Sequence, residues 1–383
     1  MPRLGATTTT LTSTARAVME RHLHRDGYTV PSALVYPWQW LWDSAFHAIA
    51  WNALDRPDRA LVELDTLLGC QRRDGFVPHI RYHGPSPHAD FWKLPDTSAI
   101  TQPPMYGHAI ARLHRAGVDI PTGLLERARQ GFDFLLRHRA RVDGLVSVVH
   151  PWETGADNSP RWDHWVDGHF SLDRWWVVKG ELVRSIMPSD AGAPISNSAF
   201  ACAPAGFNAL VAFNALELAW VTDDEHLQRD ALEIVDRLDV SWSAEAGTWV
   251  DVGDSGHGSG RVRTLDALLP LLVSRRPVAV RSAIDQLLDP CAFAATYGPT
   301  GVHRAEEVFR PDQYWRGSAW PQLTYLLWWA ARNRGEARLE ESLRTSARRG
   351  AARSRMAEHW HPDDGTGLGA VPQSWSALVV AMA

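Results

Sequence analysis

Apolar residues recur at intervals of three and four along most of the chain, a spacing that places them on one face of an α-helix. This periodicity predicts about a dozen helices, over residues 12–25, 42–54, 58–71, 102–116, 122–138, 206–221, 225–239, 263–274, 279–289, 319–333, 336–357 and 374–382. Val-rich segments typical of β-strands are short and few, at residues 145–150, 177–182 and 248–252. The pattern therefore predicts an all-α fold.

Long irregular segments rich in Pro, Gly, Asp, Ser and Trp separate several of these helices, most clearly at residues 81–101, 151–171 and 188–204. Segments of this length usually form binding loops or lids. A dozen helices joined by such loops favour a helical toroid, in which inner and outer helices alternate and the loops build a pocket, whereas an α-solenoid has shorter, less aromatic loops. No linker interrupts residues 1–383, so we expect a single domain.

Composition narrows the class of protein. Of the 383 residues, 45% are hydrophobic, which is enough for a large core. The formal net charge of −5 disfavours a nucleic-acid partner. No apolar run approaches the length of about 18 residues that a membrane span needs, and the N-terminus lacks the apolar segment of a signal peptide. We therefore expect a cytoplasmic protein without a membrane partner.

The chain contains three widely spaced cysteines, Cys70, Cys202 and Cys291, which do not form a disulfide framework or a zinc motif. It has no phosphate-binding loop, metalloprotease motif, nucleophile elbow or dinucleotide fingerprint, so no cofactor is expected. His359, His361 and Asp363 are residue types that bind metals, but this spacing within a loop is a weak indicator of a metal site. We predict none.

Tryptophan is unusually frequent, with 19 residues against 7 Tyr and 11 Phe. Indole rings either fill an aromatic core or line a carbohydrate pocket, where the C–H face of a sugar stacks on them. Trp38, Trp40 and Trp42 alternate directly before Asp43 and Ser44. Asp43 or Ser44 is placed to cap the following helix, and the same segment can equally form a pocket wall in which Asp43 binds sugar hydroxyls.

Two carboxylates lie in segments suited to catalysis. Asp157 follows Gly155 in a run of small and polar residues between Trp152 and Trp162. It either forms a turn before Pro160 or acts as a general acid whose pKa is raised by desolvation.

Glu358 is placed at the end of the predicted helix 336–357, where the helix dipole disfavours a carboxylate without a partner or a function. In the aromatic segment 310–321, Arg316 is expected to stack on a ring or pair with a carboxylate, and Gly317 lets the backbone approach a ligand.

Taken together, four segments resemble glycoside hydrolase family 63 and its (α/α)6-toroid relatives, including the trehalases of family 37. The likeness is strongest to the short bacterial branch of mannosylglycerate and glucosylglycerate hydrolases. The segments occur in the family's order and span nearly the whole chain. They are Gln39-Trp40-Leu41-Trp42-Asp43-Ser44-Ala45-Phe46, Gly155-Ala156-Asp157-Asn158-Ser159-Pro160, Tyr314-Trp315-Arg316-Gly317, and Glu358-His359-Trp360-His361-Pro362 with Ser374-Trp375-Ser376-Ala377.

The resemblance implies that Asp157 is the general acid and Glu358 the general base. It also implies a set of residues that hold the sugar, namely Tyr36, Trp40, Trp42, Asp43, Gln102, Tyr314, Trp315, Gly317, Trp320 and Gln373. Ser318 replaces the Pro usual at its position, and residues 164–198 depart from the glycerate-binding region of that branch, which leaves the aglycone open.

We therefore predict an exo-acting α-glycosidase that removes a terminal α-linked hexose, with glucose expected, from a small glycoside or short oligosaccharide. Inversion requires a base that activates water on the face opposite the acid, with the two carboxyls about 6.5–9.5 Å apart. Indole stacking on the sugar is expected from Trp40, Trp42, Trp315 and Trp320. The other acidic candidates are Glu153, Asp163, Glu306 and Glu307, of which the last two are the rivals for the base.

Two other functions stay open at this point. A sugar epimerase or isomerase on the same toroid would use histidines as acid and base, and His79, His359 and His361 are the loop candidates. A carbohydrate-binding protein without catalysis would keep the indole faces but would not use the two carboxylates as a pair. In each case the partner is a small carbohydrate, and self-association into a homo-oligomer remains an option.

Overall fold

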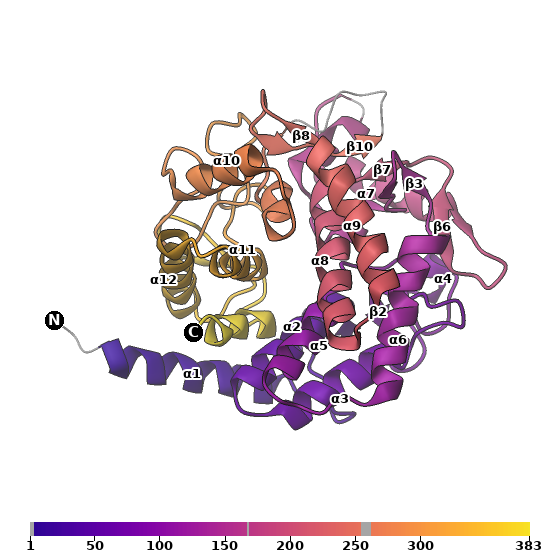
Figure 1. Ribbon diagram of the computed structural model, residues 1–383, viewed down its shortest axis with the longest axis horizontal. Helices are drawn as coiled ribbons and strands as arrows, with labels where there is room; N and C mark the ends of the chain where they lie inside the picture. The colour runs from indigo at the N-terminus through magenta and orange to yellow at the C-terminus, as the bar shows by residue number, and fades with distance from the viewer. Residues whose placement is uncertain (1–3, 167, 254–261) are drawn as a thin grey trace.

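Helices arranged as a closed ring form the framework of the structure (Figure 1). The computed structural model describes residues 4–166, 168–253 and 262–383. Within these ranges, six segments form the inner ring, and each contacts the next until the last contacts the first. They are α2 (Leu41–Ala53), α5 (Tyr106–Arg115), α8 (Ala205–Thr222), the 3₁₀ helix η4 (Leu265–Leu272), α11 (Pro321–Asn333) and the 3₁₀ helix η5 (Ser374–Ala381).

An outer set of helices packs around this ring, consisting of α1 (Leu4–Arg21), α3 (Pro57–Leu68), α6 (Thr122–Asp133), α9 (Glu225–Val240), α10 (Pro277–Leu288) and α12 (Ala337–Arg353). The inner helices α2, α8 and α11 bury most of their residues and are apolar around most of their circumference. The outer helices bury one face, as α12 does with Leu339, Leu343, Ala347 and Ala351. The predicted helical toroid is therefore confirmed.

The sequence led us to expect no segment long and apolar enough to cross a membrane, but the inner helix α8 is such a segment. It has 18 residues and passes that test by length and composition. However, 72% of it is buried, because it packs between α5, α9 and η4. Its apolar sequence is accounted for by this place in the core.

Short elements connect the helices. The strands form antiparallel pairs, which are β1 (Gln39–Trp40) with β2 (Ile80–Arg81), β3 (Arg141–Val142) with β4 (Leu145–Val146), β5 (Ile186–Pro188) with β6 (Pro194–Asn197), β7 (Cys202–Ala203) with β10 (Val252–Gly253), β8 (Trp242–Ser243) with β9 (Thr248–Trp249), and β11 (His359–Trp360) with β12 (Gly367–Leu368). The remaining helices are α4 (Ala89–Trp92), the π-helix η1 (Phe134–His138), the 3₁₀ helices η2 (Pro151–Thr154) and η3 (Pro160–Trp165), and α7 (Leu172–Arg184).

The strand predicted at residues 177–182 is wrong, because this segment lies inside α7. The hydroxyl of Ser171 accepts a hydrogen bond from the backbone N–H of Arg174 and caps the helix, which outweighs the β-branched pair Val177-Val178.

Several predicted helices also differ from the structure in extent or type. The helix predicted at 12–25 is α1, Leu4–Arg21, and the one predicted at 122–138 is α6 followed by the π-helix η1. The helix predicted at 102–116 begins at Tyr106, after Pro103-Pro104, and the one predicted at 336–357 ends at Arg353. The segments predicted as helices at 263–274 and 374–382 are 3₁₀ helices. In the first of these, Pro270 removes a backbone donor that an α-helix would use.

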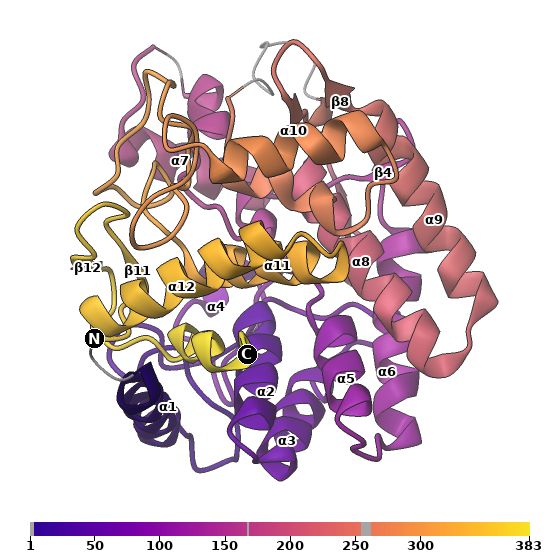
Figure 2. The ribbon, with the colours of Figure 1, turned by 60° about the vertical axis from the view of Figure 1, so that its left-hand side comes forward.

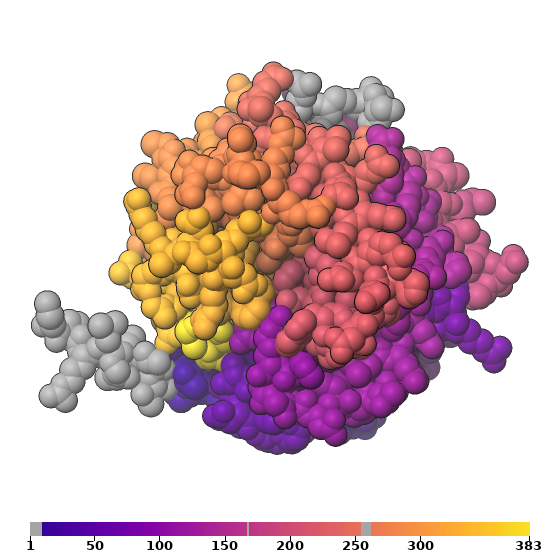
Figure 3. All heavy atoms as spheres, viewed as in Figure 1, coloured from indigo at the N-terminus to yellow at the C-terminus, as the bar shows by residue number. Residues whose placement is uncertain are grey.

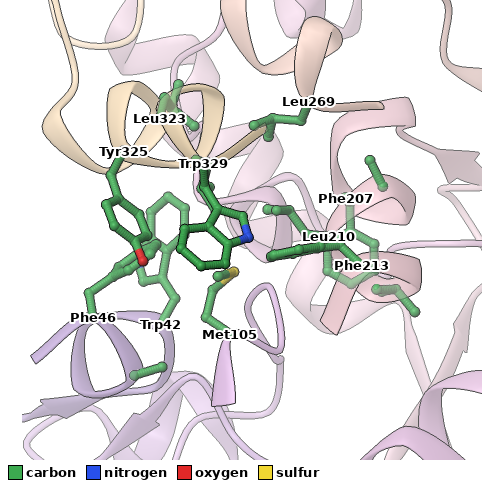
Figure 4. Packing of buried hydrophobic residues seen from close by; sticks show 14 of the residues in the cluster. Trp42, Phe46, Met105, Phe207, Leu210, Phe213, Leu269, Leu323, Tyr325 and Trp329 are labelled. Atoms are coloured by element: carbon green, nitrogen blue, oxygen red, sulfur yellow. The ribbon is translucent and has the colours of Figure 1, made fainter. Parts of the chain in front are cut away.

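The centre of the ring is filled by side chains rather than open. The close view in Figure 4 shows rings and aliphatic groups from the inner segments meeting there, namely Trp42 and Phe46 of α2, Phe207, Leu210 and Phe213 of α8, Leu269 of η4, and Leu323, Tyr325 and Trp329 of α11. In the space-filling view, atoms cover the middle of the same face that Figure 1 presents (Figure 3). Part of the high aromatic content is therefore core.

Loops and short elements gather on one side of the ring. Figure 2 shows α7, β11 and β12 on this side, and α4 contacts α7 directly. This side carries the long segments 81–101 and 151–171 that the sequence marks as irregular. The toroid thus supplies a rigid base on which these segments build a cavity.

Candidate active site

A cavity of about 620 Å³ lies among these loops, within the usual size range of ligand pockets. Asp43 in the first turn of α2, Gln102 in the loop before α5 and Gln373 directly before η5 all line it. Three inner segments therefore begin at the cavity. Closure of the ring brings these remote parts of the chain together.

Nine of the twelve predicted site residues line this cavity, namely Tyr36, Trp40, Trp42, Asp43, Gln102, Asp157, Tyr314, Glu358 and Gln373. Seven of the chain's tryptophans line it as well, so the cavity wall is largely aromatic. These are Trp38, Trp40, Trp42, Trp92, Trp152, Trp176 and Trp375.

Trp315, Gly317 and Trp320 do not line the cavity, in contrast to the prediction. Trp320 is fully buried and stacks between Trp315, at 3.8 Å between ring centroids, and His359, at 4.5 Å. Trp315 in turn stacks on Trp42 at 6.5 Å. These rings support the cavity wall from behind rather than facing a ligand.

Gly317 is required by the backbone of its own loop. Its φ of +155° and its approach to Arg310 leave no room for a side chain, because a Cβ would lie 2.9 Å from the Arg310 carbonyl. Arg316 makes both interactions that its sequence setting suggested. Its guanidinium forms two hydrogen bonds to Asp163, at 2.8 and 2.7 Å, and lies over the ring of Phe170.

The loop that carries Asp157 is held by indole N–H groups. Trp175 donates to the carbonyl of Asp157 at 2.9 Å and Trp162 to that of Ala156 at 3.0 Å. Gly155, at φ +74°, packs so closely on the Trp42 ring that a Cβ would collide with it. The Asp157 carboxyl is therefore presented to the cavity by a fixed backbone.

Glu153, one of the other acidic candidates, is a structural anchor of this loop. It is completely buried and forms two hydrogen bonds with Arg139, at 2.6 and 3.1 Å. Its carboxylate also accepts from the backbone N–H groups of Thr101 and Val149, at 3.0 and 2.7 Å. Glu153 thus ties the loop of Gln102 to the loop of Asp157.

Glu358 approaches the cavity from the turn before β11 and not from a helix end, since α12 ends at Arg353. One carboxylate oxygen accepts from the Tyr36 hydroxyl at 3.1 Å, and the other accepts from the backbone N–H of Ala370 at 2.9 Å. Gly369, at φ +70°, leaves space for the second oxygen that a Cβ would occupy. The Glu358 carboxylate is therefore oriented from both sides.

Burial dominates the ionisation of both carboxyls. It raises the pKa of Asp157 to about 7, with a further increase from the charge of Glu358 and an opposing decrease from Lys179. Burial also raises the pKa of Glu358, although hydrogen bonds from Ala370, Tyr36 and Tyr314 favour its ionised form. Asp157 thus keeps its proton near neutral pH, whereas Glu358 has donors arranged for its anion. Asp43, the third carboxyl in the cavity wall, also has its pKa raised by burial and by the charge of Glu358.

Lys179 was not anticipated from the sequence. Among the described residues that line the cavity it is the only lysine or arginine. Its ammonium group donates to Asn158 at 3.4 Å and lies over the rings of Trp176 (4.1 Å), Trp152 (5.0 Å) and Trp175 (5.5 Å). Burial lowers its pKa to about 8. Lys179 follows Trp176 by three residues and Trp175 by four. On a helix, this spacing places Lys179 next to both tryptophans.

The rival base candidates lie elsewhere. Glu306 pairs with Arg263 at 2.6 Å, and neither Glu306 nor Glu307 lines the cavity.

The loop histidines do not converge on a common point. His79 lines the cavity, whereas His359 packs on Trp320 and His361 lies 3.6 Å from Asp364. Asp363 pairs instead with Arg304 at 3.1 Å. In the part of the chain that the structure describes, no cluster of three or more metal-binding side chains occurs.

Comparison with known proteins identifies the family. Residues 36–376 match the family described as the mannosylglycerate hydrolase MGH1-like glycoside hydrolase domain. The chain belongs to this family. It is therefore a glycoside hydrolase, and its resemblance to glycoside hydrolase family 63 is confirmed.

Characterised relatives cover nearly the full chain. A mannosylglycerate hydrolase from Thermus thermophilus is 29% identical over 94% of this chain and 97% of that protein. A glucosylglycerate hydrolase from Mycolicibacterium hassiacum is 29% identical over 92% and 93%, respectively.

Solved structures agree with this assignment. A family 63 mannosylglycerate hydrolase from Thermus thermophilus, in complex with Tris and D-glycerate, superposes with a TM-score of 0.82 at 26% identity, over 97% of this chain and 99% of that one. The neutral trehalase of Saccharomyces cerevisiae, with a TM-score of 0.59 at 14% identity, covers 92% of this chain and 72% of its own and shares the fold.

Replacing Glu153 with Gln tests its role as an anchor. The change leaves the buried Arg139 guanidinium without a counter-ion, so we expect the free energy of unfolding to fall by about 3–5 kcal/mol. The matched control is Glu341→Gln on α12, whose pair with Arg344 is largely exposed, and there we expect a loss of at most about 1 kcal/mol. Equal Tm values for the two variants would contradict the assignment.

Proposed function

We propose that this glycoside hydrolase removes a terminal α-linked hexose, with glucose preferred, from a small glycoside or short oligosaccharide by inversion. Asp157 acts as the general acid and Glu358 as the general base. The observation that carries the proposal is the contrast between these carboxyls within one cavity. Asp157 has a pKa of about 7, whereas Glu358 receives hydrogen bonds that favour its anion. The same proposal assigns the ring to the (α/α)6 class, with η4 and η5 as inner members.

The reaction follows from these two ionisation states. Protonated Asp157 gives its proton to the glycosidic oxygen while the bond from that oxygen to the anomeric carbon breaks. Ionised Glu358 takes a proton from a water molecule whose oxygen bonds to the anomeric carbon from the opposite face. The products are the free hexose, with inverted configuration, and the protonated aglycone. A proton shift from Glu358 to Asp157 through solvent restores the starting state.

Several cavity residues offer a hexose the contacts that it needs. Trp40 and Trp42 provide aromatic surface, and the carboxyl of Asp43 and the amide of Gln102 provide hydrogen-bonding groups for hydroxyls. The indole N–H of Trp40 and the side-chain oxygen of Gln373 are buried and have no hydrogen-bond partner in the protein. Such groups are normally satisfied, so sugar hydroxyls are their natural partners. The relatives named for mannosylglycerate and glucosylglycerate support an α-hexoside as substrate.

Substitution of each carboxylate tests the assignment. Asp157→Asn keeps the size of the side chain but removes the proton donor, so we expect substrate binding to persist and kcat to fall by about 10²–10⁴-fold. Glu358→Gln should lose turnover to a similar extent and regain part of it with azide, an anionic nucleophile that needs no base. Steady-state kinetics on an α-hexoside that the wild type hydrolyses measures both effects.

The matched control is Glu307→Gln, a carboxylate from the rival pair that lies outside the cavity wall, which should keep wild-type turnover. Unchanged kcat in Asp157→Asn would refute the acid assignment. Loss of turnover in Glu307→Gln with rescue by azide would transfer the role of base to that residue.

The pH profile tests the charge environment of Asp157. The acid form is the active one, so kcat/KM should decline as pH rises through about 7. The Lys179 cation lowers the pKa of Asp157, and Lys179→Met should therefore move this basic limb to higher pH, whereas Lys179→Arg should leave it near its original position. A limb that stays in place or moves to lower pH in Lys179→Met would contradict the account.

A further inference from the structure

An aromatic platform at the cavity mouth lies outside the set of sugar-holding residues considered so far. It consists of Phe91 on α4, Trp152 at η2 and Trp176 on α7, all three of which line the cavity. The Trp152 ring lies 6.2 Å from Phe91 and 5.6 Å from Trp176. Contact between α4 and α7 holds the three parts together.

The platform leaves large apolar surface exposed to water. Trp176 is 57% and Phe91 38% exposed, although the same helix α7 buries Trp175 completely. Exposed aromatic surface that lines a cavity is typical of a binding site, because a ligand that covers it removes this surface from water. The core does not use these rings, so a ligand is their natural partner.

The platform lies next to the general acid. Lys179, whose ammonium group lies over both Trp152 and Trp176, donates to Asn158, the residue that follows Asp157. Trp175, beside Trp176 in the chain, donates to the Asp157 carbonyl. Because the general acid protonates the leaving-group oxygen, groups clustered around Asp157 lie on the aglycone side of the bond that breaks.

We propose that Phe91, Trp152 and Trp176 form the leaving-group site and that this site accepts a second pyranose ring. The inference rests on the proposed function and specifies its substrate class as an α-linked disaccharide or a longer chain with such an end. A pyranose presents a face of C–H groups that covers an indole, whereas a three-carbon acid such as glycerate has no ring to lay on it.

The burial of Lys179 at this site is consistent with an uncharged pyranose as the leaving group. Lys179 is only 2% exposed, and its ammonium group lies over the rings of three tryptophans. The surface presented at the mouth is therefore carbon rather than an open cation. An acidic aglycone would have to reach the Lys179 ammonium group between these indole faces.

Kinetics with three classes of aglycone on the same hexose tests the proposal. The substrates are α-linked disaccharides such as kojibiose and nigerose, the neutral acyclic glucosylglycerol, and the acidic acyclic glucosylglycerate, together with the corresponding α-mannosides. We expect the best disaccharide to exceed both acyclic substrates in kcat/KM by about tenfold or more. Trp176→Ala should lower kcat/KM for the disaccharide by about tenfold more than for the acyclic substrates.

The matched control is Val177→Ala, which removes an apolar side chain, 62% exposed, from the same helix but outside the cavity wall. It should change none of the three activities. If the wild type prefers glucosylglycerate and Lys179→Met loses this preference, the leaving-group site binds an acidic aglycone and the proposal of a pyranose site is wrong. An equal loss for all substrates in Trp176→Ala would overturn it as well.

Calorimetric binding separates this inference from the proposed function. Intact disaccharide is titrated into Asp157→Asn, with and without Trp176→Ala. One outcome is that the wild type hydrolyses none of the substrates, yet the disaccharide binds and Trp176→Ala weakens this binding about tenfold. In that case the proposed function fails and the platform stands. If the wild type hydrolyses α-glucosides but Trp176→Ala leaves disaccharide affinity unchanged, the platform fails and the function stands.

Discussion

The removal of two carboxyls from water is the physical condition on which the site depends. In water, Asp157 and Glu358 would both be ionised at neutral pH and would have nearly the same chemistry. In the aromatic cavity, burial favours the neutral form of each carboxyl, and the neighbouring hydrogen-bond donors then make their ionisation differ. Glu358 accepts hydrogen bonds from the Tyr36 hydroxyl and the Ala370 N–H, whereas the pKa of Asp157 is lowered in part by the charge of Lys179.

The closed ring of helices fixes the positions of the side chains that line the cavity. The inner segments α2, α5 and η5 each begin at the cavity, so core packing fixes the positions of Asp43, Gln102 and Gln373. Behind the wall, a stack of rings from Trp42 through Trp315 and Trp320 to His359 connects α2 with the strand that follows Glu358. The tryptophans thus serve both roles that the composition allowed, with some in the core and others in the wall.

Much of this could be predicted from the sequence. The amphipathic helices follow directly from their periodicity, and the four ordered segments locate the loops that meet at the cavity. Local sequence does not show which side of a loop faces inward, however. The sequence therefore could not reveal that Trp315 and Trp320 stack behind the wall, since that depends on packing between segments distant in the chain.

The segment around Lys179 shows a second limit. Its β-branched residues suggest a strand, but the capping hydroxyl of Ser171 and the contact with α4 make it a helix. Only the helix places Trp176 and Lys179 together on the cavity side.

The stereochemistry of the first product tests the central claim most directly. Proton NMR during the first minutes of hydrolysis of an α-hexoside distinguishes the anomer released by the enzyme from the one formed later by mutarotation. A base-activated water that attacks opposite the leaving group gives the β-anomer, which is the predicted result. Initial release of the α-anomer would show that Asp157 and Glu358 do not act as an inverting pair.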